Sequence, residues 1–229
     1  MSRVPKRLPQ ILTKEEFDRV IRIILDEENV KTQKQKFSRL RNVICLNLMY
    51  YCGLRPMESY ACKVSYVDFN KKMLYIPAQA NKQRHEDNVD LPDFIVEMLY
   101  SYIIIKNKFF KETDWLFPVR NNNVINHIDR SHIAKVFRDA IKKAELYKIS
   151  YTDKQGLNRA NLSLYSLRAS YGTFVYSKTK DIRRTALMLR HRDYFCRSTL
   201  CYIQVVEAFE RKSIIKELFP QQEVSIFSS

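Results

Sequence analysis

The stretch Gly53-Leu54-Arg55-Pro56-Met57-Glu58 follows a long apolar run and contains the two residue types that end and begin helices. Glycine is common just after a helix C-terminus, and proline is favoured at the first position of a helix. We therefore expect one helix to end at Gly53, a short helix to begin at Pro56, and Arg55 to lie in the turn between them. The apolar residues of the preceding helix are Val43, Ile44, Leu46, Leu48 and Met49.

Helical patterns flank this stretch on both sides. Thr13 and Glu16 have the spacing of a capping box, which predicts that a helix starts at Thr13 and continues through Phe17. The period changes after Val64, where residues 64–69, 73–76 and 88–91 are predicted to pair as a small antiparallel sheet. Helices are expected again over residues 93–107, 129–144, 163–177, 182–190 and 207–218.

The expected fold is mainly α with a small antiparallel three-stranded β-sheet, an α+β arrangement. We expect a single domain over residues 1–229, with a core at residues 8–205 and a C-terminal helix and tail at residues 206–229.

Composition indicates a polyanion as partner. The 229-residue chain has 40 Lys and Arg against 25 Asp and Glu, a formal charge of +15, and its 45% hydrophobic content predicts a globular fold. Apolar runs are too short to cross a bilayer, and residues 1–6 lack the apolar centre of a signal peptide. Nucleic acid is therefore favoured over a membrane surface, and an intracellular, cytoplasmic location is expected.

No metal or cofactor is expected. The five cysteines form no Cys-x-x-Cys pair, and the odd count in an intracellular chain argues against a disulfide framework. The four histidines show no metal-ligand spacing with one another or with cysteine.

Two arginines have positions suited to binding a phosphate. Cleavage of a phosphodiester adds negative charge to the phosphate oxygens, and a protein without a metal must offset it with fixed cations. Arg55 in its turn and Arg168 in a predicted helix could supply them, and Glu58 could orient the first guanidinium. The alternative is that both are solvated or backbone-contacting arginines of a basic protein.

These motifs together resemble the tyrosine recombinase (phage integrase) family, from about Leu8 to Tyr202. The similar segments are the opening at residues 8–16, Gly-Leu-Arg-x-x-Glu around Arg55, the helical arginine Arg168, and the later His191 and Tyr202. The resemblance implies a catalytic domain in which Arg55 and Arg168 bind the scissile DNA phosphate and His191 donates a hydrogen bond to it.

The resemblance also implies a lysine that protonates the departing 5′-oxygen, carried by the loop between the second and third strands. Lys82 falls in that loop and is the preferred candidate. Lys71, Lys72 and Arg84 are the alternatives. A flexible loop would let the lysine reach DNA only after binding.

Tyr202 is the candidate nucleophile, because the resemblance places it after Ser198 and Thr199. It lies eleven residues after His191, two more than is common in the family, so Tyr194 in the intervening loop is a rival. A second departure is Tyr165, which stands where the family usually has histidine. A phenol can donate a hydrogen bond to phosphate but is a poor base at neutral pH.

The leading functional hypothesis is a site-specific recombinase of a mobile genetic element that acts on double-stranded DNA through a 3′-phosphotyrosine link, without metal or ATP. The alternatives are a catalytically impaired DNA-binding protein on the same scaffold and a type IB topoisomerase. Relatives usually carry an N-terminal domain that completes a clamp around DNA, and none is expected before Leu8. Self-assembly into a dimer or tetramer on DNA, with the C-terminal helix docked on a neighbour, is a further expectation.

Overall fold

The structure is a computed structural model that describes residues 9–26, 32–80, 85–152, 155–156, 158–191 and 197–218. It divides into two compact units, residues 10–171 and residues 1–9 with 172–229. Each unit is described separately below. The expectation of a single domain over residues 1–229 stays a prediction.

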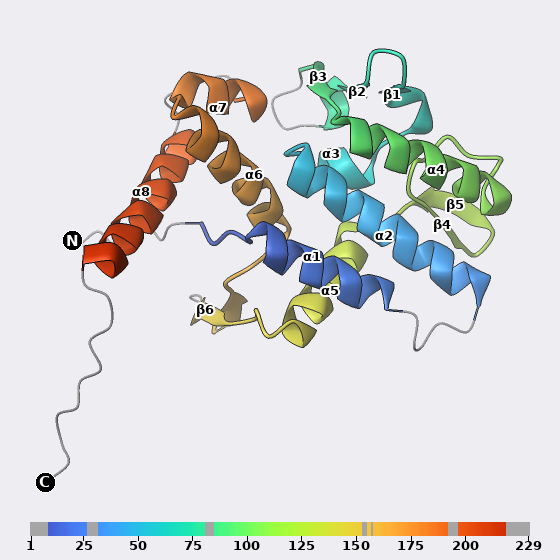
Figure 1. Ribbon diagram of the computed structural model, residues 1–229. Helices are drawn as coiled ribbons and strands as arrows, with labels where there is room; N and C mark the ends of the chain where they lie inside the picture. Colours follow the sequence, from blue (N-terminus) through green and yellow to red (C-terminus); the bar gives the residue numbers. More distant parts are fainter. Residues whose placement is uncertain are drawn as a thin grey trace, which may run out of the picture. The chain divides into compact units, whose positions relative to one another are not determined.

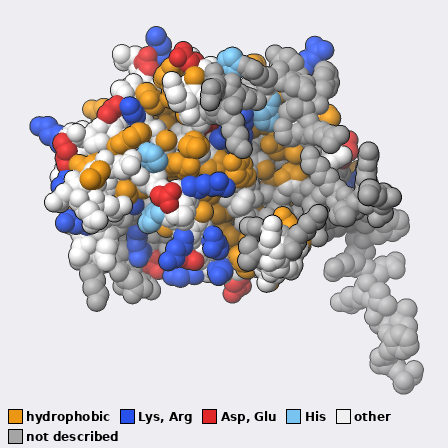
Figure 2. All heavy atoms as spheres, turned by 180° about the vertical axis from the view of Figure 1, so that it is seen from behind, with side chains coloured by type: hydrophobic (Ala, Val, Ile, Leu, Met, Phe, Trp, Pro, Cys, Tyr) orange, Lys and Arg blue, Asp and Glu red, His pale blue; other side chains and the backbone are white. Residues whose placement is uncertain are grey.

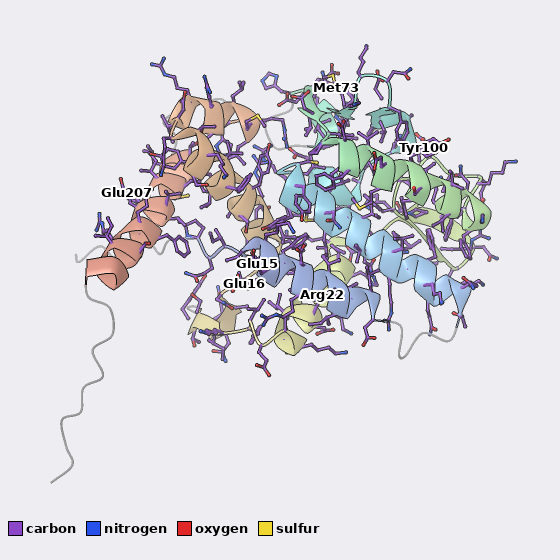
Figure 3. The ribbon with its side chains drawn as sticks, in the orientation of Figure 1. Glu15, Glu16, Arg22, Met73, Tyr100 and Glu207 are labelled. Atoms are coloured by element: carbon purple, nitrogen blue, oxygen red, sulfur yellow. The ribbon has the colours of Figure 1, made fainter. Side chains whose placement is uncertain are left out.

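Helix α1 (Lys14–Leu25) begins at the capping box that the sequence predicts. The Glu16 backbone N–H donates to Thr13 Oγ1 at 3.2 Å, and the Thr13 N–H donates to the Glu16 carboxylate at 2.9 Å. Glu15 and Glu16 lie in the first turn (Figure 3), where negative charge stabilises the helix dipole. Phe17, Val20 and Ile24 form the buried face of this helix.

Four long helices pack together in the unit at residues 10–171: α1, α2 (Gln33–Tyr51), α4 (Asp93–Phe109) and α5 (Arg130–Lys143). α2 packs against both α1 and α4, and α5 packs against α1 (Figure 1). Since α2 has neighbours on several sides, its residues 43–49 are all buried and it has no one-sided apolar stripe. The short helix α3 (Pro56–Tyr60) follows with Pro56 at its first position, as predicted.

The three-stranded antiparallel sheet is confirmed, with the order β1 (Val67–Asp68), β2 (Met73–Ile76) and β3 (Asp87–Asp90). The prediction that the first strand begins at Val64 is wrong, because the segment Val64–Tyr66 forms a 3₁₀ turn. Asp114 is the cause. Its backbone carbonyl accepts a hydrogen bond from Val64 N–H at 2.8 Å, and its carboxylate binds both the N–H and the hydroxyl of Ser65.

Two further hairpins were not predicted. β4 (Pro118–Asn121) pairs with β5 (Val124–His127) across a turn at Asn122 and Asn123, which have φ of 47° and 64°. Asparagine tolerates this left-handed backbone, so the Asn-Asn pair was an available signal for a tight hairpin turn. The second hairpin joins β6 (Ile149–Thr152) and β7 (Asn158–Ala160).

The boundary between the two units falls within α6 (Leu164–Thr179). In the second unit, α7 (Ile182–Met188) packs against α8 (Arg197–Leu218). The sequence predicted a last helix over residues 207–218, and α8 begins ten residues earlier. Tyr202, Val205 and Val206 are buried at helical spacing, which explains the longer helix and places Tyr202 inside it.

Basic side chains are numerous on the surface. On the face shown in Figure 2, several Lys and Arg side chains gather along the lower edge, while others lie scattered among hydrophobic ones. No described helix combines the length and apolarity that a membrane crossing requires. Within the described ranges, no group of three potential metal ligands occurs, and Cys45 and Cys62 are free thiols.

Candidate functional site

Gly53 shapes the turn that carries Arg55. Its φ is +61°, in the left-handed region that glycine adopts without strain. A Cβ atom at this position would lie 2.4 Å from Cδ1 of Tyr171, so the tyrosine ring also requires the absence of a side chain. The chain thus leaves α2 at a fixed angle, and the Gly53 carbonyl is held close to α6.

Arg55 and Glu58 are joined by two hydrogen bonds at the start of α3. The backbone N–H of Arg55 donates to Glu58 Oε2 at 2.8 Å, and its Nη1 donates to Glu58 Oε1 at 2.6 Å. Because the carboxylate binds both the backbone and the guanidinium, the Arg55 side chain has little freedom to rotate away.

Arg168 reaches the same carboxylate from α6. Its Nη1 donates to the Gly53 carbonyl at 2.5 Å and lies 3.9 Å from Glu58 Oε2. The structure therefore brings Arg55, Glu58 and Arg168 together, although more than a hundred residues separate the two arginines. We refer to these three residues as the arginine pair cluster.

The arginine pair cluster has one positive charge more than negative. The Glu58 side chain is fully buried, the Arg168 side chain is 6% exposed, and the Arg55 side chain is 25% exposed. A buried carboxylate requires such cationic partners, since its desolvation would otherwise be very costly. The excess cation at a partly open position is suited to a further anion, with Arg55 as the accessible member.

Two other site residues were predicted, Tyr165 and Lys82, and the structure describes only the first. Tyr165 precedes Arg168 by one turn of α6 and is 53% exposed, so its hydroxyl is accessible to a ligand. Lys82, with its rival Arg84, lies outside the described residues. Lys72, another rival, forms an exposed ion pair with Asp93 at 2.7 Å.

His191 is positioned by the end of α7. Arg190 has a φ of 54°, and its N–H donates to the Leu187 carbonyl at 2.8 Å. The His191 N–H donates to the Ala186 carbonyl at 2.9 Å. These two bonds form a Schellman motif, which ends the helix and sets the direction in which His191 leaves it.

The ring of His191 is hydrogen-bonded to α8. Its Nδ1 lies 2.6 Å from Thr199 Oγ1, and Thr199 is fully buried. A hydrogen bond at one ring nitrogen fixes the orientation of the other. Thr199 precedes Tyr202 by three residues and therefore shares its side of the helix. The sequence reasoning did not identify Thr199 as the partner of His191.

Tyr202 is buried, with 6% of its surface exposed. Its ring lies against Gly172 of α6, where a Cβ atom would be 3.0 Å from both Cε2 and Cζ of the ring and 2.9 Å from Cδ1 of Leu189. Such distances are shorter than normal van der Waals contact. Gly172 thus provides the space for the tyrosine ring, a role that a helical glycine in this glycine-poor chain could have suggested.

Residues 10–207 match the family model described as the phage integrase family. A tyrosine recombinase of Thermosipho africanus is 24% identical over 208 residues, covering 91% of this chain and 62% of the relative. The tyrosine recombinase XerD of Bradyrhizobium diazoefficiens is 26% identical over 232 residues, covering 96% of this chain and 67% of the relative. The chain thus spans about two thirds of the length of these two relatives.

Solved structures share the fold. The crystal structure of XerA recombinase has a TM-score of 0.66 at 21% identity and covers 96% of this chain and 68% of its own. The catalytic domain of bacteriophage HP1 integrase has a TM-score of 0.53 at 15% identity and covers 93% of this chain and 99% of its own. The mainly helical fold with a small antiparallel sheet is therefore that of a known catalytic domain.

Replacing Glu58 by glutamine should destabilise the fold by about 3 kcal/mol, because two arginines would share a buried site without a negative charge. The free energy of urea unfolding measures the loss. Glu112→Gln is the matched control, since Glu112 pairs with Arg120 on the exposed surface and its loss should cost less than about 1 kcal/mol. Equal losses in the two variants would contradict the central role of the Glu58 carboxylate.

Alanine at position 172 tests the contact with Tyr202. In a helix interior, Gly→Ala stabilises by about 1 kcal/mol where space allows. We expect no such gain for Gly172→Ala in the wild-type chain, because the new Cβ crowds both the Tyr202 ring and Leu189 Cδ1. In a Tyr202→Ala background the same substitution should be more favourable, because only the Leu189 contact remains. Thermal unfolding of the two single variants and the double variant measures this coupling. A gain of equal size in both backgrounds would show that the ring does not occupy this space.

Proposed function

Since this chain belongs to the phage integrase family, we propose that it cleaves and rejoins double-stranded DNA at specific sites through a 3′-phosphotyrosine intermediate, without metal or ATP. The observation that carries the proposal is the arginine pair cluster, in which two guanidinium groups share one buried carboxylate. Residues 8–205 supply the catalytic domain in this proposal, and the second half of α8 follows it.

Arg55 and Arg168 bind the scissile phosphate in this proposal. Their combined charge exceeds that of Glu58 by one, which matches the charge that a phosphodiester brings to the site. As the phosphorus becomes pentacoordinate, its equatorial oxygens gain negative charge and the bonds from the fixed guanidinium donors strengthen. Glu58 acts as a positioning residue, because it holds both arginines and does not face the substrate.

Tyr202 is the nucleophile in this mechanism. Its phenol oxygen forms a bond to phosphorus while the bond from phosphorus to the 5′-oxygen breaks, and the phenol proton passes to a water molecule as attack proceeds. An ordinary phenol has a pKa of about 10, so in this proposal the cations that bind the phosphate must also stabilise the phenolate as it develops. His191 donates a further hydrogen bond to the phosphate, and Thr199 holds the orientation of its ring.

Lys82 gives a proton to the departing 5′-oxygen, which becomes a free 5′-hydroxyl. Attack of a 5′-hydroxyl on the phosphotyrosine reverses these chemical steps: it restores a phosphodiester bond and releases Tyr202. The phosphodiester energy is conserved in the covalent link, so no external energy source is needed. Tyr165 replaces the histidine usual in the family and adds a hydrogen-bond donor near Arg168, with little capacity as a base.

DNA binding has to expose the nucleophile, because Tyr202 is 6% exposed and is seated against Gly172. A ring in this position is protected from water and from electrophiles. Two structures with related folds support a DNA partner. One is XerH site-specific recombinase bound to a palindromic difH substrate in a post-cleavage complex, and the other is XerH bound to a difH substrate in a pre-cleavage complex.

Tyr202→Phe should abolish a covalent protein–DNA adduct on a nicked suicide substrate that carries the attachment site. The adduct is measured on denaturing gels with and without protease, in the presence of a chelator to test the metal-free reaction. Tyr194→Phe is the control and should retain the adduct. An adduct that persists in Tyr202→Phe and disappears in Tyr194→Phe would identify the rival tyrosine as the nucleophile.

The same assay separates the alternatives. The second candidate is a catalytically impaired DNA-binding protein, because Tyr165 stands where the family usually has histidine. That protein would shift the attachment site on native gels and form no adduct with any variant. Relaxation of a supercoiled plasmid that lacks the site would instead indicate a type IB topoisomerase.

Assembly on DNA is the last part of the proposal. Phe209 and Ile214 of α8 are exposed apolar residues that a neighbouring protomer could cover. Light scattering of the protein with DNA that carries two binding sites should give the mass of a dimer or tetramer. Phe209→Glu should lower that mass, and a complex that remains monomeric in the wild-type protein would refute self-assembly.

A further inference from the structure

A large cavity lies between the first half of α2, the end of α4, the β4–β5 hairpin and the start of α5. Its volume is about 850 Å³, and all of its lining residues belong to the unit at residues 10–171. Basic and aromatic side chains meet in its wall: Lys34, Arg41, Arg120, Phe37, Phe109 and Phe110. Cavities of this size commonly hold small molecules.

Arg41 is the buried charge of this cavity, with 4% of its surface exposed. Its Nη1 donates to the Pro118 carbonyl at 2.9 Å, and its Nε and Nη2 lie 3.4 and 3.3 Å from Asn42 Oδ1. No carboxylate of the described chain forms an ion pair with it. A guanidinium has five N–H donors, so two remain beyond these three bonds.

A buried cation without a counter-ion is unfavourable. Burial lowers the pKa of Arg41 for this reason. Glu58 and its two arginines show the contrasting case, in which a buried carboxylate balances buried guanidinium charge. Arg41 therefore occupies a site where an anion from outside the chain would be stabilised.

The rest of the lining keeps the cavity positive. Lys34 is exposed, and Arg120 forms an ion pair with Glu112 and lies over the Phe110 ring at 5.7 Å. Asp129 is the acidic lining residue, and its carboxylate caps α5 by accepting hydrogen bonds from the N–H and hydroxyl of Ser131. The three basic side chains thus outnumber the single acid.

One wall of the cavity is aromatic. The Phe37 ring centroid lies 5.1 Å from that of Phe109 and 5.6 Å from that of Phe110. These rings offer an apolar surface on which a planar group can pack. A small hydrated ion would gain nothing from that surface. The combination calls for a ligand with a charged end and an apolar body.

We propose that this cavity binds an organic anion. A phosphate or carboxylate group meets the remaining N–H donors of Arg41, and an aromatic body packs against the three phenylalanines. The site is separate from the arginine pair cluster, since the ten residue steps of α2 from Arg41 to Tyr51 span about 15 Å and Arg55 lies beyond that end. The proposal does not depend on the proposed DNA reaction.

Titration of the ¹⁵N-labelled full chain with phenyl phosphate tests the proposal. We expect saturable shifts of the backbone amides of Phe37, Arg41 and Arg120. Inorganic phosphate lacks the apolar body and benzyl alcohol lacks the charge, so both should bind at least about tenfold more weakly. Absence of saturable shifts at millimolar phenyl phosphate, or equal binding of benzyl alcohol, would overturn the proposal.

Variants locate the site. Arg41→Gln should weaken phenyl phosphate binding by about tenfold or more, because it removes the charged donors. Arg41→Gln also removes the hydrogen bond to the Pro118 carbonyl and could disturb the fold. The double variant Lys34→Glu/Arg120→Glu is therefore a second test, because it changes exposed residues and leaves Arg41 in place. It should weaken binding as well. Arg138→Glu, an exposed change on α5 outside the cavity, should not. Unchanged affinity in the double variant would contradict the site.

Discussion

The buried carboxylate of Glu58 is the constraint on which the proposed reaction depends. It accepts hydrogen bonds from the backbone and side chain of Arg55 and lies within ion-pair distance of Arg168. One negative charge cannot neutralise two guanidinium groups, so the cluster keeps a positive charge at a fixed place. The turn at Gly53, the start of α3 at Pro56 and the packing of α6 all serve to hold that charge.

The candidate nucleophile is restrained by different means. Tyr202 is a buried residue of α8, and its ring lies against Gly172. The same helix holds Thr199, which is hydrogen-bonded to His191. Movement of α8 would therefore displace the histidine and the tyrosine together. In the proposed reaction this linkage couples exposure of the phenol to the arrival of the group that binds the phosphate.

Local signals in the sequence were sufficient for much of the fold. The capping box at Thr13, the glycine that ends α2 and the proline that begins α3 are confirmed, because each acts through bonds to residues nearby in the chain. The 3₁₀ turn at Val64–Tyr66 could not be inferred from local signals, since Asp114 binds Ser65 from 49 residues away. The Asn122-Asn123 hairpin was readable from its turn residues and was missed.

The candidate site was partly predictable in the same sense. Arg55 and Glu58 are three residues apart, so their contact followed from the helix start, whereas the approach of Arg168 was expected only from the resemblance to a family. Neither the burial of Tyr202 nor its contact with Gly172 could be inferred from spacing, because both depend on how α6 and α8 pack. The role of Lys82 stays a prediction.

Substrate charge deletion is the most direct test of phosphate binding by the arginines. A methylphosphonate at the cleavage position removes the negative charge that Arg55 is proposed to meet. If the arginine acts on that charge, Arg55→Ala should lose far less cleavage rate on the methylphosphonate substrate than on ordinary DNA. An equal loss on both substrates would mean that Arg55 does not bind the scissile phosphate.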